Sequence, residues 1–163
     1  MRSMANINNI PRITSKELSK ILLSESTVSA NVDESIHLSK TAVVDVRDHD
    51  HIGGHIKYSI HAPSSTLDTK ISDLVRTLKD KELVVFHCAL SQQRGPSAAL
   101  KYLRERENLL YTGNTEFESC KNNLDSKCHS QRVFVLDKGF EGWQREFGDD
   151  TRLTEGYVKS LWL

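Results

Sequence analysis

The sequence predicts an α/β fold: a single domain in which a central, mainly parallel five-stranded sheet is flanked by helices. Five short apolar runs have the pattern of strands, and segments with helical periodicity separate them along the chain. Strands that alternate with helices form βαβ units, whose strands lie parallel. The length of 163 residues suits one domain, expected at residues 10–163, after a flexible N-terminus at residues 1–9 and with a polar insert at residues 108–131.

The composition narrows the possible partners and compartments. Lysine plus arginine and aspartate plus glutamate both number 22, so charge gives no reason to expect nucleic acid or a membrane as a partner. Three cysteines do not make a disulfide framework, and no apolar run is long enough for a signal peptide or a membrane span. We therefore expect a soluble protein of the cytoplasm, the nucleus or both.

Two elements are expected before residue 40. Ile10–Ile13 is short and contains a proline, which fits a strand at the edge of the sheet. Thr14 and Glu17 have the spacing of a capping box, so an amphipathic helix should begin here. The serine-rich stretch Ser24–Ser39 predicts a flexible loop.

The next strand, Thr41–Val46, has charged residues at its carboxyl end. These are Asp45 and Arg47, and a sheet does not bury such charges without partners. The pair therefore predicts a local structural contact at the point where the strand leaves the sheet.

Three histidines follow this strand and suggest a metal site. His51 and His55 are four residues apart, which would place them on one face of a helix. Gly53 and Gly54 interrupt any such helix, and no carboxylate–histidine pattern of a metal site follows. We therefore expect no metal at His49, His51 or His55.

A short strand and a helix are expected between residues 60 and 78. Ile60–Ala62 has the pattern of a strand, and Ser64 or Ser65 should cap the helix that follows. The apolar positions of that helix recur with the 3.6-residue period of a core-facing stripe, at Leu67, Ile71, Leu74, Val75 and Leu78.

The most informative stretch joins a buried strand to a helix through a short loop. Leu83–Phe86 is an uninterrupted apolar run, as in a strand that is buried on both faces. A helix should follow from Gly95 to about Glu107, with a proline well placed in its first turn. Cys88 and Arg94 lie in between, separated by five residues, where a parallel sheet binds its ligands.

This spacing favours an anion site with a reactive sulfur. A loop of this length can aim successive backbone N–H groups at one point, assisted by the positive end of the helix. Arg94 adds two parallel donors for an oxyanion, and the same field favours the thiolate of Cys88 as a nucleophile. Alternatively, Cys88 is only a small buried apolar side chain. The strand before it and the helix start after it favour the catalytic interpretation.

The remaining elements complete the sheet. Leu109–Gln131 is long, polar and the least predictable part of the chain. Arg132–Leu136 should be the last buried strand, and Gly139–Phe147 a helix with Trp143 turned inward. The tail Leu153–Leu163 is apolar enough to dock on the domain.

Three motifs of the sequence resemble the rhodanese-fold phosphatases of the cell-division-cycle dual-specificity group and the related arsenate reductases of fungi and plants. The likeness is greatest to the small single-domain fungal members. It spans most of residues 41–147. The motifs are His87-Cys88-x5-Arg94-Gly95-Pro96, Asp45-Val46-Arg47 with Gly54-His55-Ile56, and Lys138-Gly139-Phe140 with Trp143.

The resemblance implies a rhodanese-like fold and a role for each site residue. Cys88 and Arg94 would be catalytic, while Asp45, Arg47 and His87 would brace and shape the loop without taking part in the chemistry. The backbone N–H groups of the loop would bind the oxyanion, and they belong to Ala89, Leu90, Ser91, Gln92, Gln93 and Arg94.

Loop length and loop composition distinguish between activities of this family. Sulfurtransferase rhodaneses usually have a loop one residue shorter, so the longer loop here implies phosphate or arsenate. The mitotic phosphatases carry carboxylates directly after the cysteine and before the arginine, where this chain has Ala89 and Gln93. A loop general acid is therefore missing, and Ala89–Gln92 is similar to plant members associated with arsenate reduction as well as phosphatase activity.

The expected function is a cysteine-dependent tyrosine or dual-specificity phosphatase that hydrolyses phosphomonoesters through a phosphocysteine, with no cofactor. Its substrate would be a phosphoprotein or a small phosphate or arsenate oxyanion. The alternative is arsenate reduction, in which glutathione with glutaredoxin, or else Cys120 or Cys128, resolves the adduct on Cys88. A third possibility is a non-catalytic module that binds phosphoproteins, which the presence of both Cys88 and Arg94 disfavours.

Overall fold

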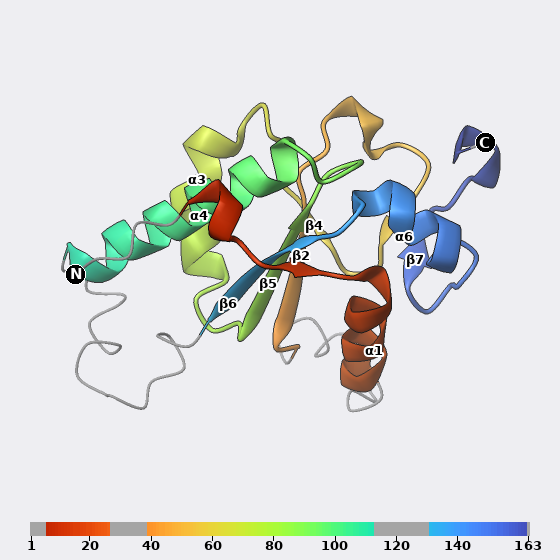
Figure 1. The fold of residues 1–163 in the computed structure, drawn as a ribbon, viewed down its shortest axis with the longest axis horizontal. Coiled ribbons are helices and arrows are strands. Elements are labelled where there is room, and N and C mark those ends of the chain that lie inside the picture. Colours follow the sequence, from red (N-terminus) through yellow and green to blue (C-terminus); the bar gives the residue numbers. More distant parts are fainter. Residues whose placement is uncertain (1–5, 27–38, 113–130, 163) are drawn as a thin grey trace.

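The fold is known from a computed structural model, which describes residues 6–26, 39–112 and 131–162 (Figure 1). Its centre is a five-stranded sheet in which every neighbouring pair is parallel. The strand order confirms the predicted α/β architecture, with the first strand of the chain at one edge. From that edge the strands are β1 (Arg12–Ile13), β6 (Arg132–Leu136), β5 (Leu83–His87), β2 (Thr41–Asp45) and β4 (Ile60–His61).

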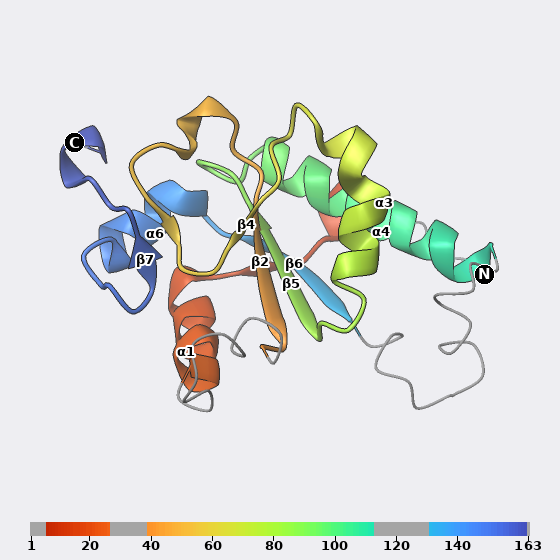
Figure 2. The same cartoon turned by 180° about the vertical axis from the view of Figure 1, so that it is seen from behind.

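The central strands are buried because helices cover both faces of the sheet (Figures 1 and 2). All residues of β2 and of β5 are buried, and the two strands pair from Thr41 with Leu83 to Asp45 with His87. Such strands carry apolar residues on both faces rather than in alternation. This explains the continuous valine-rich runs of the sequence.

Each face of the sheet has its own pair of helices and its own apolar core. Helices α3 (Leu67–Thr77) and α4 (Arg94–Tyr111) pack with Val44, Val84 and Phe86 on one side. On the other side, α1 (Ser15–Ser26) and α6 (Gly139–Phe147) pack with the side chains that point the opposite way. Trp143 is fully buried there, as the sequence predicts.

Helix starts and ends depart from the sequence expectation in two places. The capping box of α1 is present, since Thr14 and Glu17 exchange backbone-to-side-chain hydrogen bonds of 3.0 and 3.2 Å. The prediction that Ser64 or Ser65 caps α3 is wrong: Thr66 holds that position, and its side chain makes no capping hydrogen bond. Both serines bind the carboxylate of Asp48 instead.

The predicted end of α4 near Glu107 is also wrong, because the helix continues to Tyr111. Leu109 and Leu110, which sequence analysis assigns to the polar insert, are buried against the core. Gln131 closes the other end of that insert: it donates to the carbonyl oxygens of Leu78 and Lys81, at 2.7 and 2.9 Å. Residues 113–130 lie outside the described residues.

The N-terminus and the tail are more regular than the sequence indicates. Ile7–Asn9 forms a 3-10 helix (η1), where a flexible end is expected. The tail docks as predicted and builds a second, antiparallel sheet from β3 (His55–Ile56) and β7 (Thr154–Glu155). It ends in a 3-10 helix, η5 (Lys159–Trp162), whose Trp162 ring contacts Phe140.

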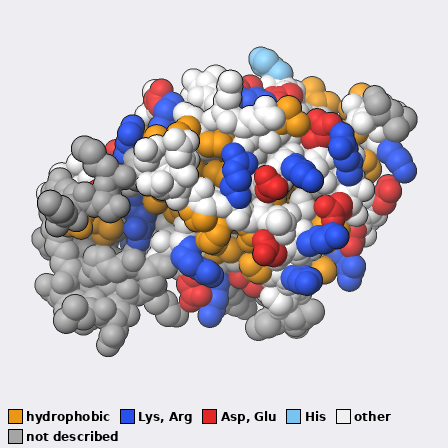
Figure 3. Space-filling view, viewed as in Figure 1, with side chains coloured by type: hydrophobic (Ala, Val, Ile, Leu, Met, Phe, Trp, Pro, Cys, Tyr) orange, Lys and Arg blue, Asp and Glu red, His pale blue; other side chains and the backbone are white. Residues whose placement is uncertain are grey.

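Neither sign of charge dominates the described part of the face that Figure 3 shows. On the face seen in Figure 3, basic and acidic side chains are interspersed over the part of the chain that the structure describes. Within the same described ranges, no helix combines the length and the apolar character needed to cross a bilayer.

Candidate active site

The sheet places Cys88 at the carboxyl end of its central strand. Strand β5 ends at His87, α4 begins at Arg94, and the loop between them carries Cys88, whose side chain is almost completely buried. The backbone N–H of Ser91 donates to Cys88 Sγ at 3.2 Å. Ser91 adopts a positive φ of 54°, which is uncommon for a residue with a side chain and turns its amide toward the sulfur. The loop therefore curls around the thiol.

Helix α6 holds the first half of this loop by donating hydrogen bonds to the carbonyl groups of the loop. The N–H groups of Phe140 and Glu141 donate to the carbonyl oxygens of Cys88 and Ala89, at 3.0 and 2.9 Å. In a trans peptide the N–H points away from the C=O. The amides that follow these two carbonyls therefore point away from α6, and they remain available to another acceptor.

The close approach of α6 to the loop requires glycine at position 139. Gly139 has a φ of 58°, and a Cβ atom there would lie 2.5 Å from the carbonyl oxygen of Ala89. Any side chain would push the helix away from the loop. This gives the Lys138-Gly139-Phe140 motif a physical role: it lets α6 orient the carbonyls of the cysteine loop.

The second half of the loop is held from the first strand of the chain. Arg12 donates from Nη2 to the carbonyl oxygen of Ser91 at 3.0 Å, and its Nη1 lies 3.7 Å from Asp137. A site role for Arg12 is not predicted from the sequence. The sequence signal that could indicate such a role is the place of Arg12 in a short edge strand, whose carboxyl end lies beside the loops of the neighbouring strands.

Ser91 also carries a buried polar atom without a partner. Its Oγ has no hydrogen bond within the described part of the chain, although the residue is fully buried. A Cβ atom added to Gly95 would lie 3.4 Å both from this hydroxyl and from the backbone nitrogen of Cys88. The hydroxyl thus lies inside the loop. Buried polar groups are normally satisfied, so this hydroxyl is a candidate ligand contact.

The guanidinium of Arg94 pairs with Asp50. Its Nη1 and Nη2 donate to the two carboxylate oxygens of Asp50, at 2.8 and 2.5 Å, and Nη1 lies 3.5 Å from Asp48. The two parallel donors that the sequence leads us to expect for an oxyanion thus face a carboxylate in this structure. The contact arises because the carboxyl end of β2 brings two carboxylates next to the start of α4.

The charges around Arg94 stabilise one another. The hydrogen bond to Asp50 raises the pKa of Arg94, and the charges of Asp50, Cys88 and Asp48 act in the same direction. The same hydrogen bond lowers the pKa of Asp50. Hydrogen bonds from Ser64 and Ser65 lower the pKa of Asp48 to about 2. Both aspartates are therefore anionic at neutral pH.

Asp45 and Arg47 form a fully buried ion pair behind this site. Arg47 donates to Asp45 from its backbone N, Nε and Nη2, with the shortest contact at 2.6 Å. Burial by itself raises the pKa of Asp45, but His87 and Arg47 overcome this effect and keep it below its ordinary value. The guanidinium also lies 4.2 Å from the centre of the Phe140 ring.

The same arginine fixes the segment that presents Asp50. Its Nη1 and Nη2 donate to the carbonyl oxygens of Asp50 and Gly54, at 3.3 and 2.8 Å. This holds η2 (His49–His51) and the turn after it against the sheet. The expected bracing role of the pair thus takes a definite form: it supports the segment opposite Arg94.

His87 lies below the loop and is completely buried. Its Nδ1 is 3.1 Å from the carbonyl oxygen of Cys88, and its Nε2 lies 3.9 Å from Asp45 Oδ2 without a hydrogen bond in the described residues. Burial lowers the pKa of His87, against the attraction of Asp45. The imidazole is therefore neutral and contacts the backbone of the loop, as expected of a shaping residue.

The histidines after β2 stack on each other. The His51 ring lies 5.4 Å from that of His55 and 3.9 Å from that of His61, measured between centroids. Burial lowers the pKa of His51 despite Asp45 nearby. Within residues 6–26, 39–112 and 131–162, no group of three or more His, Cys, Asp or Glu side chains is arranged to hold a metal.

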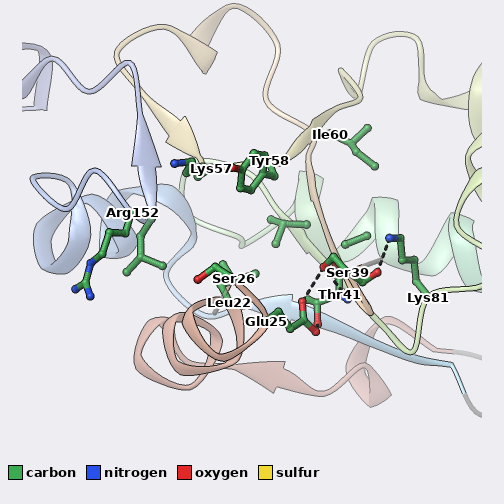
Figure 4. A pocket seen from close by; sticks show the side chains of 13 residues that line it. Leu22, Glu25, Ser26, Ser39, Thr41, Lys57, Tyr58, Ile60, Lys81 and Arg152 are labelled. Carbon is green, nitrogen blue, oxygen red and sulfur yellow. Dashed lines mark hydrogen bonds between the residues drawn. The ribbon is translucent and has the colours of Figure 1, made fainter. Parts of the chain in front are cut away.

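Two cavities in the described part of the chain differ in their relation to the cysteine loop. One of about 190 Å³ borders the loop and is lined in part by Gln93, Arg94 and Ser97. The other, of about 160 Å³, lies near the amino end of β2, where Glu25 accepts hydrogen bonds from Ser39 and Thr41 (Figure 4). Only the first adjoins the cysteine loop.

The match to known families agrees with this architecture. Residues 29–146 fit the model of the rhodanese-like domain. The chain belongs to the rhodanese-like family.

Relatives of this rhodanese-like protein carry two kinds of names. CDC25-like phosphatase YCH1 of Saccharomyces cerevisiae is 38% identical over 130 residues, which cover 74% of this chain and 76% of the yeast protein. Arsenate reductase 2.2 of Oryza sativa subsp. japonica is 38% identical over 106 residues, which cover 64% and 70% of the two chains.

A solved structure supports the fold independently. It is that of Ygr203w, a yeast protein tyrosine phosphatase of the Rhodanese family, and it superposes with a TM-score of 0.68 at 33% identity. The match covers 95% of this chain and 98% of the yeast chain. Phosphatase and reductase names therefore both occur among proteins that share most of this rhodanese-like chain.

Among the described residues, the structure brings the site residues that the sequence predicts into one continuous unit. This unit consists of Cys88, the loop up to Arg94, His87, Asp45 and Arg47. Cys120 and Cys128 lie outside the described residues. Sequence analysis misses Asp48 and Asp50, because it considers residues 48–55 only for their histidines. Two acidic residues directly after a buried parallel strand are the signal that could have found them.

Proposed function

We propose that this protein is a cysteine-dependent phosphatase, of the protein-tyrosine or dual-specificity type, that hydrolyses phosphomonoesters. The observation that carries the proposal is the loop from Cys88 to Arg94. The backbone N–H of Ser91 donates to the sulfur of Cys88, and α6 holds the first two carbonyl groups of the loop so that they point outward. This leaves inward-pointing N–H groups around a nucleophile. Such an arrangement stabilises both a thiolate and an oxyanion.

The proposed reaction has two steps that balance without a cofactor. Cys88 Sγ attacks the phosphorus as the bond to the leaving oxygen breaks, and the leaving oxygen takes a proton from water. Water then attacks the phosphorus of the phosphocysteine, so that inorganic phosphate leaves and the thiolate is restored. The loop amides and Arg94 hold the non-bridging oxygens in both steps.

The absence of a carboxylate at Ala89 and Gln93 favours a particular leaving group. An aryl oxygen needs little proton assistance, because a phenol is far more acidic than an alkyl alcohol. Phosphotyrosine is therefore the preferred phosphoprotein substrate. The hydroxyl of Ser91, buried without a partner in the described residues, is suited to donate to the sulfur when the phosphocysteine breaks down.

The likeness to the rice arsenate reductase favours a second candidate, arsenate reduction. Cys88 would attack arsenic and release water, which leaves a thioarsenate adduct. The thiol of glutathione would then attack Cys88 Sγ, so that arsenic leaves as arsenite and a mixed disulfide forms. Glutaredoxin would then reduce this mixed disulfide and restore the thiol of Cys88. If Cys120 or Cys128 attacked in place of glutathione, an internal disulfide with Cys88 would form, and glutathione would have to reduce it. The electrons come from the two thiols.

One set of assays separates these functions. Phosphatase turnover is measured with a phosphotyrosine peptide, and arsenate reduction with glutathione and glutaredoxin, for wild type, Cys88→Ser, Cys120→Ser and Cys128→Ser. The proposal expects phosphatase turnover that Cys88→Ser abolishes, with phosphate binding retained. Turnover that survives Cys88→Ser contradicts it. Binding of phosphopeptides by wild type without any turnover would instead indicate a non-catalytic module.

A further inference from the structure

The carboxylate of Asp50 occupies both outer nitrogens of the Arg94 guanidinium. The two contacts, at 2.8 and 2.5 Å, run from Nη1 to Oδ1 and from Nη2 to Oδ2. This is the paired geometry that arginine uses for carboxylates and for phosphates alike. The two donors that face Asp50 therefore cannot also hold a substrate oxyanion.

Asp50 is held in this position by the fold. Its carbonyl oxygen accepts from Arg47 Nη1 at 3.3 Å, and its Oδ1 accepts from the backbone N–H of Asp48 at 3.0 Å. Arg47 in turn is anchored by the buried carboxylate of Asp45. The contact to Arg94 is thus the outer end of a chain of interactions that begins in the sheet.

The neighbouring Asp48 has a different task. Its Oδ2 accepts from Ser64 Oγ at 2.6 Å and its Oδ1 from the N–H of Ser65 at 3.0 Å, which leaves only a 3.5 Å contact to Arg94. Both of its oxygens are committed to the start of the α3 segment. Asp50 is the carboxylate whose oxygens both face Arg94.

We propose that Asp50 is a positioning residue that holds Arg94 in competition with the substrate, and that an oxyanion must take over the arginine donors from it. The proposal rests on the proposed function of the Cys88 loop and adds what sets its affinity: Asp50 weakens the binding of phosphate-like anions. Free inorganic phosphate and a phosphoprotein substrate both offer oxyanion oxygens to Arg94, so Asp50 weakens the binding of both.

The exposure of the pair makes such an exchange feasible. The side chains of Arg94 and Asp50 are 34% and 42% exposed, so each can be rehydrated as the other is released. Ion pairs with this exposure contribute little to stability in general. A bound oxyanion that also receives several loop amides can outcompete one carboxylate.

The test compares phosphate affinity in Cys88→Ser and in Cys88→Ser with Asp50→Asn, by calorimetric titration of inorganic phosphate. We expect the dissociation constant to fall about five- to tenfold when Asp50 loses its charge. The matched control is Asp68→Asn, which breaks an exposed 2.8 Å pair with Lys101 on the same side of the sheet but does not contact Arg94. It should leave the constant unchanged.

Steady-state kinetics add a readout that a purely structural role would not move. In an otherwise wild-type chain, Asp50→Asn should lower the inhibition constant of phosphate and the KM for a phosphotyrosine peptide by similar factors. Asp50→Glu, which keeps the charge, should stay near wild type. Phosphate affinity that is unchanged or weaker in Asp50→Asn overturns the inference, because Asp50 would then only orient Arg94.

Failure of the inference and failure of the proposed function give different results. Phosphate binding that tightens in Asp50→Asn without any phosphatase turnover refutes the function but supports the competition. Turnover that depends on Cys88, with no gain in phosphate affinity on removing the carboxylate, refutes the competition alone. No phosphate binding by any variant refutes both.

Discussion

Two arginine–aspartate pairs with nearly the same shortest contact distance lie within the same site. The Nη2–Oδ2 distance is 2.6 Å between Arg47 and Asp45 and 2.5 Å between Arg94 and Asp50. The first pair is completely buried, whereas the side chains of the second are 34% and 42% exposed. What each pair does therefore depends on its access to water and not on its distances.

Burial makes the first pair a fixed brace. A charge without water has no alternative partner, so neither residue can leave the other without a large cost in free energy. Exposure makes the second pair exchangeable, because water and ions can replace either partner. The site thus combines a permanent support with a releasable contact, and Arg47 links them through the carbonyl oxygen of Asp50.

Breaking the buried pair should have the largest effect on stability. Arg47→Met leaves the Asp45 carboxylate buried without its cation and removes the bonds to the Asp50 and Gly54 carbonyl oxygens. Loss of one partner of a buried pair costs about 3–5 kcal/mol. Urea denaturation of both proteins, compared at neutral pH, measures the difference in the free energy of unfolding. A loss below about 1 kcal/mol would show that the buried pair is not a brace.

Acid should weaken the buried region before it affects the exposed pair. His87 is buried and its pKa is lowered, so the unfolded chain takes up a proton near the ordinary pKa of about 6.5 that the folded chain does not. Stability contributed by the neutral imidazole is therefore lost as the pH falls below that value. His51, whose pKa burial also lowers, acts in the same direction.

The Asp50 carboxyl titrates in a different window. Arg94 lowers its pKa, so the pair contributes its stability above the ordinary carboxylate pKa of about 3.9 and loses it only below.

The histidine effect can be measured with His87→Asn. Between pH 6 and pH 4.5 we expect the slope of unfolding free energy against pH to drop by up to about 1.4 kcal/mol per unit in this variant. Equal slopes in the two proteins would mean that His87 titrates normally when folded.

How far the sequence predicts this molecule depends on whether a feature is local. The buried strands, the capping box and the strand–loop–helix unit around Cys88 follow from neighbouring residues, and all appear in the structure. The end of α4 does not follow in this way: Leu109 and Leu110 look like part of a polar stretch until the core that they contact is known. Ser64 and Ser65 were expected to cap a helix because the competing acceptor, Asp48, is 16 or 17 residues away.

The site shows the same limit more sharply. Cys88, His87, Asp45 and Arg47 are recognisable because their motifs are continuous in sequence. Asp50 and Arg94 are 44 residues apart in sequence. The acidic residues after β2 indicate that Asp50 lies at this edge of the sheet, but the sequence does not show that it pairs with Arg94. Such pairs become visible only once parallel strands bring their carboxyl ends together. The exchangeable Arg94–Asp50 pair is thus the part of the site that the sequence predicts least well.

The comparison is tested most directly by breaking the exposed pair, where the effect on stability should be the smallest. Arg94→Met should change the free energy of unfolding by less than about 1 kcal/mol, since an exposed pair contributes little and the methionine can stay in solvent. The same variant should lose phosphatase turnover, because the donors for the oxyanion are gone. Urea denaturation and the phosphotyrosine peptide assay on one preparation measure both. If Arg94→Met unfolds as easily as Arg47→Met, the two pairs do not differ in kind. Exposure would then not explain why one of them can open.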